Sequence, residues 1–410
     1  MKKASIVSIG NELLNGVTID TNLSYLSSRL LSLGIITVGC YTVGDDIDAI
    51  VRALNLAADD SDVVLATGGL GPTDDDLTRK GFARLLNVEL RLDSHILKRI
   101  EDFFTSRNRT MPPTNRIQAY VPAGARPLQN NLGTAPGILA THREKMFIAM
   151  PGVPVEMKHM FEESVLPGLT QLAGDQAVVL RKLRCFGAGE SNIAEMLGTI
   201  MQRGRNPQIN CTVQCGVITL HVVATAVDTE KASEMAEQDE NRIRQILAEL
   251  VYGTDEQTLA EVAGEKLARQ GKTVAVAESC TGGMVAKMLT DVPGASRYFT
   301  YGWVVYSNKA KKTELRVPER LIAEYGAVSE QVAAAMAEGA KRRAQSNCVI
   351  AITGIAGPTG GTADKPAGLV YITVGSDSSF ETRRFIFSHG RDFVRLRAAQ
   401  TALNMLRLKL

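Results

Sequence analysis

The chain has 410 residues, which is enough for about three domains of ordinary size. Hydrophobic residues make up 45% and charged residues 22% of it, and these globular values exclude a disordered or fibrous chain. Lys plus Arg outnumber Asp plus Glu by 46 to 44, so the net charge of +2 gives no global attraction to nucleic acid or to an anionic membrane.

Six cysteines are scattered along the chain and form no C-x-x-C pair. Cys211 and Cys215 lie four residues apart, without a His or second Cys pair beside them to complete a zinc site. We therefore expect reduced, buried thiols. The apolar stretch near the N-terminus is too short for a secretory signal, and no apolar run approaches the ~18 residues of a membrane helix. These features predict a cytoplasmic protein without a membrane partner.

Residues 1–165 alternate between strand and helix patterns. The predicted elements are a buried strand at 5–9, a helix with leucines at helical spacing at 23–33, a strand at 35–43, a helix at 47–54 and a strand at 63–67. This βαβαβ order predicts a parallel sheet with helices on its faces. Such sheets bind ligands at the carboxyl ends of their strands.

Residues 166–253 follow a different order. The predicted elements are a strand at 178–186, a short helix at 191–200, strands at 208–213 and 217–227, and a long polar helix at 229–250. This βαββα order is that of a small KH-like α+β domain. KH domains clamp nucleic acid with a G-x-x-G loop. Because this region lacks such a loop, we expect a packing or dimer-forming role and no nucleic-acid partner.

Residues 254–410 return to alternation. The predicted elements are a helix from 259 to Gly271, strands at 273–277 and 298–306, a helix at 329–344, strands at 348–352, 368–374 and 380–387, and a final helix from 392. The predicted fold class is therefore α/β. Two domains with parallel or mixed sheets, at 1–165 and 254–410, are separated by the small KH-like α+β domain.

The first candidate site follows the strand at 63–67. Gly68, Gly69 and Gly71 allow the backbone to approach a phosphate closely, and their N–H groups can form an anion-binding nest. Three consecutive Asp residues at 74–76 would repel that phosphate unless a divalent cation lay between them, and hard oxygen ligands suit Mg²⁺ or Mn²⁺. The alternative is an Asp-rich solvated turn that caps a helix.

The second candidate site lies between the strand at 273–277 and the next helix. Ser279 at this junction could attack a carbonyl while free N–H groups at the helix start stabilise the oxyanion. The motif is not G-x-S-x-G, so no Ser-His-Asp triad is implied, and His389 is the single His of this domain. A partly buried Lys311 could be neutral and accept the Ser279 proton. Alternatively, Ser279 is a helix cap and Lys311 a surface charge.

Several segments of residues 1–165 resemble the molybdopterin-binding fold as it occurs in the CinA family. They are GGLGPTDDDLT at 68–78, GNELLNG with DTN at 10–22, GTAPG at 133–137 and PGVPVEM at 151–157. The resemblance implies hydrolysis of ADP-ribose at its pyrophosphate with a divalent metal (Mg, Mn or Co). Asn11 stands where the family usually has Asp.

The same resemblance implies roles for particular residues of the first domain. Asp75 and Asp76 would hold or position the metal. Glu12 and Asp20 would line the entrance of the same site. The residues that would cradle phosphate are Gly68, Gly69, Gly71 and Thr73.

Residues 258–410 resemble the CinA carboxyl-terminal domain. The matching segments are AESCTGG at 277–283, YSNKAK at 306–311, GAVS at 326–329 and TGIAGPTGG at 353–361 with KPAG at 365–368. The resemblance implies a nicotinamide-nucleotide amidase that converts nicotinamide mononucleotide and water to nicotinate mononucleotide and ammonia without a cofactor.

By this resemblance Ser279 is the nucleophile, Lys311 its base and Tyr306 an assisting hydroxyl. Thr353 and Gly354 would line the nucleotide pocket. The loop that would meet the substrate and hold the oxyanion with its N–H groups is Cys280, Thr281, Gly282 and Gly283. Cys280 is a rival nucleophile because a thiolate is intrinsically stronger, but no His stands near it to activate it. The residue that binds the phosphate of the nucleotide is left open, and the candidates are Arg297, Lys365 and Arg391.

The leading interpretation is a two-activity enzyme of pyridine-nucleotide salvage that binds nicotinamide mononucleotide and ADP-ribose. The alternative is a non-enzymatic nucleotide- or molybdopterin-binding protein with a regulatory or competence-related role. Ser279, Tyr306 and Lys311 discriminate between them, because a binding module has no need of this set. We expect a homodimer, both by resemblance and because most soluble assemblies are symmetric.

Overall fold

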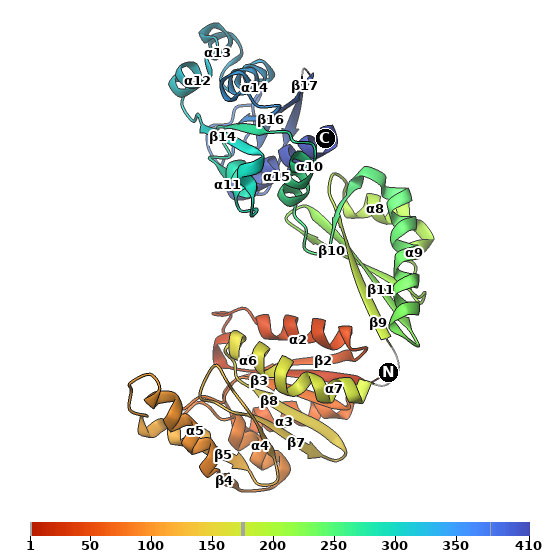
Figure 1. Cartoon of the computed structure of the whole chain (residues 1–410), viewed down its shortest axis with the longest axis vertical. Coiled ribbons are helices and arrows are strands. Elements are labelled where there is room, and N and C mark those ends of the chain that lie inside the picture. The colour runs from red at the N-terminus through yellow and green to blue at the C-terminus, as the bar shows by residue number, and fades with distance from the viewer. Residues whose placement is uncertain (1, 174–176, 378) are drawn as a thin grey trace. The chain divides into compact units, whose positions relative to one another are not determined.

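A computed structural model describes residues 2–173, 177–377 and 379–410 of the chain (Figure 1). The chain divides into two compact units, residues 1–179 with 224–234 and residues 180–223 with 235–410. The predicted fold class is confirmed. The N- and C-terminal domains contain mixed sheets, and a small domain with an antiparallel sheet lies between them in the sequence.

The N-terminal domain is built on a six-stranded sheet. Its order is β2 (Ile36–Val43), β1 (Lys3–Ile9), β3 (Val63–Thr67), β8 (Lys145–Met150), β7 (Gly137–His142) and β6 (Arg126–Leu128). The first four strands are parallel, and β7 and β6 are antiparallel to their neighbours. The chain passes from β1 to β2 on one side and then to β3 on the other. This reversal opens a crevice at the carboxyl ends of β1 and β3.

Helices cover both faces of this sheet, as Figure 1 shows. They are α2 (Thr21–Ser32), α6 (Pro154–Met160) and α7 (Leu166–Ala173) on one face, and α3 (Ile47–Asp59) and α4 (Thr78–Leu86) on the other. Alternation along β1 explains this, because Ile6 packs with the first group and Val7 with the second. Leu169 of α7 is buried in the same core, so this domain continues past residue 165.

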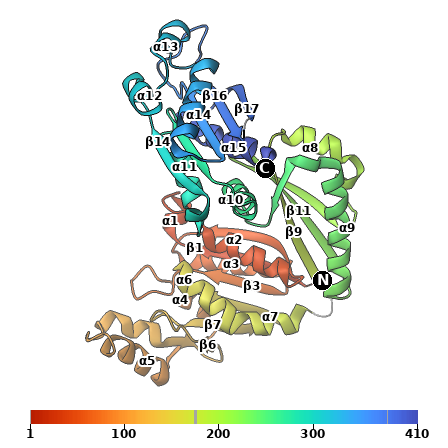
Figure 2. The same cartoon turned by 45° about the horizontal axis from the view of Figure 1, so that its top comes forward.

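A small subdomain interrupts the alternation between α4 and β6. It consists of β4 (Leu90–Leu92), α5 (Ser94–Thr105), a 3-10 helix (Pro113–Ala119) and β5 (Tyr120–Pro122). It has its own two-stranded sheet and a small core in which Ile96 and Ile100 of α5 are buried. Figures 1 and 2 show α5 at the edge of the N-terminal domain. The sequence patterns gave no prediction of this subdomain.

The middle domain has the predicted βαββα order. Its sheet runs β10 (Gln208–Gln214), β11 (Val217–Ala226), β9 (Ala177–Cys185) and β12 (Val251–Thr254). Its helices are α8 (Glu190–Leu197) and α9 (Thr229–Leu247). The fourth strand was not predicted. It pairs antiparallel with β9, which lies more than sixty residues earlier in the sequence.

The C-terminal domain repeats the plan of the first. Its sheet runs β14 (Phe299–Val304), β13 (Val274–Glu278), β15 (Cys348–Gly354), β16 (Leu369–Ser376) and β17 (Ser379–Ile386). The first three strands are parallel and the last two antiparallel. The chain moves from β13 to β14 on one side and later to β15 on the other. This domain therefore has its own crevice, at the carboxyl ends of β13 and β15.

Two groups of helices bury the faces of this second sheet. They are α10 (Leu259–Arg269), α11 (Met284–Thr290) and α15 (Arg391–Lys409) on one face, and α12 (Asn308–Leu315), α13 (Glu319–Tyr325) and α14 (Glu330–Ala344) on the other. Val276 and Ala277 are neighbours on β13 and face opposite groups. The helices α12 and α13 were not predicted as separate elements.

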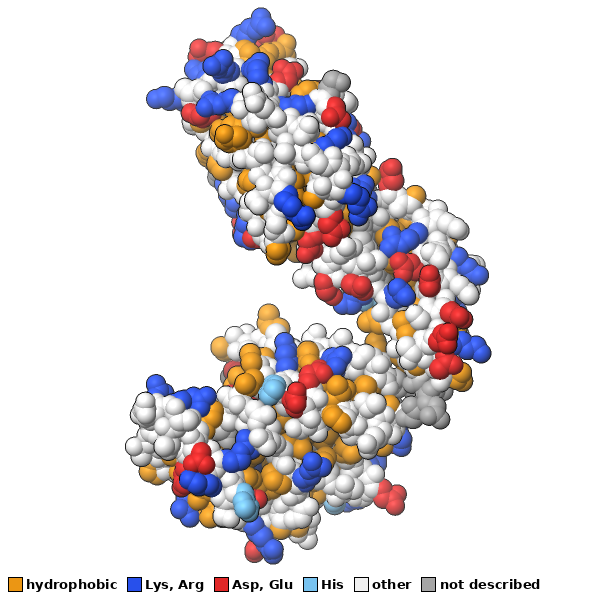
Figure 3. All heavy atoms as spheres, in the orientation of Figure 1, with side chains coloured by type: hydrophobic (Ala, Val, Ile, Leu, Met, Phe, Trp, Pro, Cys, Tyr) orange, Lys and Arg blue, Asp and Glu red, His pale blue; other side chains and the backbone are white. Residues whose placement is uncertain are grey.

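The surface carries no obvious field of one sign on the face drawn in Figure 3, where Lys and Arg side chains are interspersed with Asp and Glu. In the described part of the chain, no helix has the length and apolar character needed to cross a bilayer. The mixed surface charge agrees with the near-neutral charge of the whole sequence.

Candidate active sites

Ser279 and Lys311 meet in the crevice of the C-terminal domain. Ser279 follows the last residue of β13, and Lys311 lies on α12, 32 residues later. The Nζ atom of Lys311 is 3.0 Å from the Oγ atom of Ser279. Lys311 is 1% exposed and Ser279 is 7% exposed. This placement overturns the alternative in which Lys311 is a solvated surface charge.

The surroundings of Lys311 fit a neutral amine. Its Nζ also lies 2.9 Å from the carbonyl oxygen of Val305 and 3.2 Å from that of Tyr306. A neutral amine has two N–H donors for these two carbonyls and one lone pair, which the Ser279 hydroxyl can use by donating its proton. Burial lowers the pKa of Lys311 from its ordinary value, which favours this form. After proton transfer, the ammonium can donate to all three oxygens without moving.

Cys280 lies beside Ser279 but is poorly suited to be the nucleophile. Burial raises the pKa of its thiol to about 12, although hydrogen bonding from its own amide and that of Thr281 acts in the opposite direction. A thiol with such a pKa is protonated near neutral pH and is a weak nucleophile. The same two amides are the N–H groups of this loop that can face an oxyanion, because the amide of Gly282 already donates to the carbonyl of Ser279.

Glu278, the last residue of β13, fixes the turn that carries Ser279. Its side chain is buried, and its carboxylate accepts hydrogen bonds from the amides of Gly283, Val285 and Ala286 at 2.9–3.1 Å. These amides form the start of α11, so Glu278 rather than Ser279 caps that helix. These three amides are therefore not available to an oxyanion. Sequence reasoning gave Glu278 no role.

A cavity of about 310 Å³ opens next to Ser279 and Lys311. Its wall includes the predicted residues Cys280, Tyr306, Thr353 and Gly354. The predicted residues Thr281, Gly282 and Gly283 are not among the described residues that line it. Gly354 fits this position because a Cβ atom would lie 2.7 Å from the carbonyl oxygen of Leu369.

Arg391 also lines this cavity and provides a positive charge there. Its guanidinium donates to the carbonyl of Gly357 at 3.2 Å and to the Tyr306 hydroxyl at 3.4 Å. Lys365 donates instead to the carbonyls of Tyr325 and Val328, and Arg297 lies in a 3-10 helix before β14. Of the three basic residues considered from sequence, Arg391 is the one in the cavity wall.

The crevice of the N-terminal domain holds a second cavity, of about 430 Å³. Residues from the ends of β1 and β3 meet there. Those predicted from sequence are Glu12, Gly68, Gly69, Gly71, Asp75 and Asp76. Gly68 has φ +100°, and a Cβ atom on it would lie 2.1 Å from the carbonyl oxygen of Ile9, so this close crossing of two chain segments requires glycine.

Asp76 shapes the glycine-rich loop. Its carboxylate accepts hydrogen bonds from the amides of Gly71 and Thr73 at 2.7 and 2.8 Å and also from the Thr73 hydroxyl. Thr73 itself is exposed and is not among the described residues of the cavity wall. Asp20 is not among them either. It caps α2 by accepting from the amide of Leu23.

Asp45 is a cavity residue that sequence reasoning missed. It stands two residues after the end of β2, and its carboxylate accepts from the amide of Asn11 at 3.0 Å. Burial raises the pKa of Asp45, and the negative charges of Glu12, Asp75 and Asp76 raise it further. The available signal was its position, because it follows a parallel strand at the same edge of the sheet as Gly10 and Gly68.

The donor set of this cavity fits a cation that is shared with a phosphate ligand. Among the described residues, no three His, Cys, Asp or Glu side chains are close enough to hold a metal ion by themselves. Mg²⁺ typically takes one or two carboxylates and completes its shell with water and substrate phosphates. The negative charges of Glu12, Asp75 and Asp76 raise the pKa of Asp45, and a bound cation would neutralise such charges.

Three family models together cover nearly the whole chain. Residues 5–171 match a probable molybdopterin binding domain, residues 180–253 the damage-inducible protein CinA KH domain, and residues 256–410 the CinA C-terminal domain. Each matched segment corresponds to one of the three larger sheets of the structure.

Relatives of full length are similar throughout. A protein of Caldicellulosiruptor bescii named for competence-damage induction is 42% identical over 99% of both chains. A CinA-like protein of Kosmotoga olearia is 40% identical over 99% of this chain and 98% of its own. A solved structure of a competence/damage inducible protein from Agrobacterium tumefaciens is 40% identical, with a TM-score of 0.36, and covers 36% of this chain and 91% of that one. The chain belongs to the CinA family.

Proposed function

We propose that the C-terminal domain hydrolyses the carboxamide of nicotinamide mononucleotide to nicotinate mononucleotide and ammonia. The observation that carries this proposal is the 3.0 Å contact between Lys311 Nζ and Ser279 Oγ, with both side chains buried at the edge of a cavity. A buried amine held against a serine hydroxyl is the arrangement of a base and the nucleophile that it activates.

The first half of the reaction forms an acyl-enzyme. The neutral amine of Lys311 takes the proton of Ser279 as Oγ attacks the carboxamide carbon. The amides of Cys280 and Thr281 would donate to the oxyanion of the tetrahedral intermediate. The Lys311 ammonium then gives its proton to the nitrogen of the carboxamide. The carbon–nitrogen bond breaks, ammonia leaves, and Ser279 carries a nicotinoyl ester.

The second half restores the enzyme. Lys311, neutral again, takes a proton from a water molecule as the water oxygen attacks the ester carbon. The carbon–oxygen bond to Ser279 breaks, and Lys311 returns the proton to Oγ. The product, formed as the carboxylic acid, gives its remaining acidic proton to the solvent and leaves as a carboxylate. These steps need the cavity to admit water on the Lys311 side, and the exposed Tyr306 hydroxyl, which Arg391 contacts, would guide it.

Arg391 would pair with the phosphate of the nucleotide. It is a permanently charged side chain in the cavity wall, and its present acceptors are a carbonyl and a hydroxyl rather than a carboxylate. Nicotinamide mononucleotide differs from nicotinamide riboside only by this phosphate. A comparison of the two substrates, with wild type and Arg391→Ala, therefore isolates this contact.

We propose further that the N-terminal domain hydrolyses the pyrophosphate of ADP-ribose to AMP and ribose 5-phosphate. The observation that favours it is a glycine-rich loop that shares one cavity with Glu12, Asp45, Asp75 and Asp76. Asp45 and Asp75 would hold a divalent cation with the substrate phosphates. When bound, this cation would neutralise the pyrophosphate charge. Asp76 would keep the loop amides in place, as its bonds to Gly71 and Thr73 do now.

One set of incubations tests both proposals. Purified protein is incubated with nicotinamide mononucleotide and with ADP-ribose, each with and without chelator. Ammonia release that is insensitive to chelator supports the amidase, and AMP release that chelator abolishes supports the pyrophosphatase. If neither product forms, the enzyme proposal is wrong. The non-enzymatic alternative then predicts binding of these nucleotides without turnover.

A further inference from the structure

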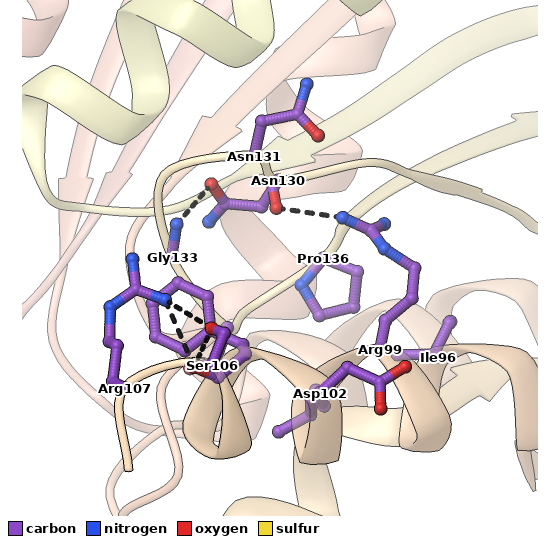
Figure 4. A pocket seen from close by; sticks show the side chains of 12 residues that line it. Ile96, Arg99, Asp102, Ser106, Arg107, Asn130, Asn131, Gly133 and Pro136 are labelled. Carbon is purple, nitrogen blue, oxygen red and sulfur yellow. Dashed lines mark hydrogen bonds between the residues drawn. The ribbon is translucent and has the colours of Figure 1, made fainter. Parts of the chain in front are cut away.

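A cavity of about 300 Å³ in the unit of residues 180–223 and 235–410 has no role in the steps above. Its wall is formed by β9, β11 and β12 of the middle domain and by α10, α11 and α15 of the C-terminal domain. Val217 and Tyr252 of the middle domain are buried in the same hydrophobic core as these three helices. The cavity that Figure 4 shows, between α5 and the segment 130–136, belongs to the N-terminal site instead, because Thr134 lines both.

Gln400 of α15 is a buried amide whose oxygen has no hydrogen bond. The residue lines the cavity and is 8% exposed, and among the described residues its Oε1 finds no donor. Buried polar groups are normally paired, so an unpaired one in a cavity wall marks a place that a ligand can complete. Rotation of the terminal amide, whose torsion has a broad minimum, can turn this oxygen toward a ligand. Gln400 therefore favours a ligand with an N–H or O–H donor.

Arg184 of β9 brings a positive charge to the same wall. Its guanidinium donates to the hydroxyls of Thr219 at 3.1 Å and Tyr252 at 3.4 Å, and within the ranges that the structure describes no carboxylate pairs with it. Hydroxyl acceptors leave the charge of a guanidinium uncompensated, and its planar N–H groups match the two oxygens of a carboxylate. Arg184 therefore favours an anionic group on the ligand.

Glu261 and Asp291 also line the cavity and limit the charge of that group. Glu261 accepts from the amide and the hydroxyl of Thr258 in the cap of α10, and Asp291 is paired with Lys287. Both carboxylates have partners of their own and leave Arg184 free, but their negative charges would repel a phosphate dianion more than a monoanion. A carboxylate is therefore the anion that suits this wall best.

The remaining wall is largely apolar. Leu259 and Leu403 are buried there, and Met288 and Val292 are half-buried. An aromatic ring suits such a wall, because it buries apolar area at a small cost in conformational entropy and its contacts with a thioether are favourable. A volume of about 300 Å³ admits one fused ring system with a short acidic chain.

We propose that this cavity binds a small aromatic carboxylate that carries an N–H donor. The carboxylate would lie at Arg184, the ring against Met288 and Leu403, and the N–H group at Gln400. The cavity shares no described residue with the Ser279 cavity or with the cavity of the glycine-rich loop, so this ligand site does not depend on either proposed activity.

Binding of indole-3-acetate to the full chain tests the proposal, because this probe has a fused ring, a carboxylate and an N–H group. Equilibrium dialysis with the radiolabelled probe should show saturable binding, which Arg184→Met and Gln400→Leu each weaken about tenfold. The matched controls are Arg269→Met and Gln331→Leu, at exposed positions of α10 and α14 outside this cavity. Thermal melts verify that each variant is folded, as expected for Gln400→Leu because it removes an unpaired buried amide.

Two analogues of the probe assign its two polar ends. Benzofuran-3-acetate has oxygen in place of the N–H group, and tryptophol lacks the carboxylate. Each should bind wild type about tenfold more weakly than indole-3-acetate does. The first loss should disappear in Gln400→Leu and the second in Arg184→Met, because the partner of the missing group is already gone. Absence of saturable binding to wild type, wild-type affinity in both variants, or analogue losses that persist in these variants would overturn the inference.

Discussion

The amine of Lys311 and the hydroxyl of Ser279 form a buried pair whose other contacts are two main-chain carbonyls, those of Val305 and Tyr306. Carbonyls cannot give up a proton, so Ser279 is the neighbour of Lys311 that can. The local hydrogen bonds therefore define the direction of proton transfer before a substrate arrives. A helix, α12, holds the lysine and a strand end holds the serine, so the contact depends on the packing of the whole domain.

The two candidate nucleophiles, Ser279 and Cys280, are adjacent, and substitution of each in turn shows which one reacts. Ser279→Ala should reduce ammonia release from nicotinamide mononucleotide by at least a thousandfold, because the acyl-enzyme cannot form. Cys280→Ala should leave most of the activity, since the pKa of this buried thiol is raised to about 12. The kcat/KM of both variants is measured from the rate of ammonia release. The opposite pattern would make Cys280 the nucleophile.

Some features around Ser279 and Lys311 could be predicted from the sequence, and others could not. The strand at 273–277 and the turn that carries Ser279 follow from local pattern, because a strand followed by a Gly-rich turn is a local signal. The pairing of Ser279 with Lys311 followed from the family resemblance, since local pattern alone also allowed a helix cap and a surface lysine. The cap by Glu278 was not predictable, since it needs the chain to turn back so that one carboxylate meets three amides.

The strands of the subdomain around α5 were missed because they have only three residues each and show no periodicity. The helix α5 did have a local signal, since Asp93 caps it and Ile96 and Ile100 are buried four residues apart.

Lys311 should control the pH dependence of the amidase. Its pKa is lowered by burial, and the neutral form is the active base, so kcat/KM should rise with pH through this lowered pKa and then level off. Lys311→Met keeps the volume of the side chain and should remove activity by about a hundredfold to ten-thousandfold. A variant that keeps wild-type activity would exclude Lys311 as the base.

The same substitution has an effect on stability with a defined sign. Because the folded pKa of Lys311 is lowered, the unfolded chain binds more protons than the folded chain between the two pKa values. The free energy of unfolding of the wild type should therefore rise with pH across that range, and Lys311→Met should lose this rise. Urea unfolding at a series of pH values measures it. Lys309→Met, on an exposed side chain of the same helix, is the control.

Glu278 should act as a positioning residue for Ser279. Glu278→Gln replaces one carboxylate oxygen by an amide NH₂ group, which cannot accept from the α11 amides. We expect kcat to fall about tenfold while KM is retained, and the free energy of unfolding to fall by about 1–3 kcal/mol. The pH profile should not shift, because Lys311 remains the base. Glu330→Gln, on an exposed first turn of α14, should change neither kcat nor stability. A rise in KM with kcat unchanged would contradict a positioning role.

Asp45 should be the most informative carboxylate of the N-terminal cavity, because it is half-buried and its pKa is raised first by burial and then by Glu12, Asp75 and Asp76. A cation must displace its proton, so the metal concentration for half-maximal ADP-ribose hydrolysis should fall as pH rises. Asp45→Asn should increase that concentration at least tenfold, while Asp74→Asn, an exposed residue of the same loop region, should not.

Without metal, the Asp45→Asn variant should be more stable than the wild type above the pKa of Asp45. The folded chain holds the Asp45 proton to higher pH than the unfolded chain does, so ionisation of Asp45 reduces stability as pH rises through its raised pKa. Asparagine has no proton to lose and keeps an oxygen that can accept from the amide of Asn11. Thermal melts in chelator and in Mg²⁺ should therefore diverge: Asp45→Asn gains stability in the first and loses most of the metal-induced shift in the second. Equal metal-induced shifts in both proteins would remove Asp45 from the cation site.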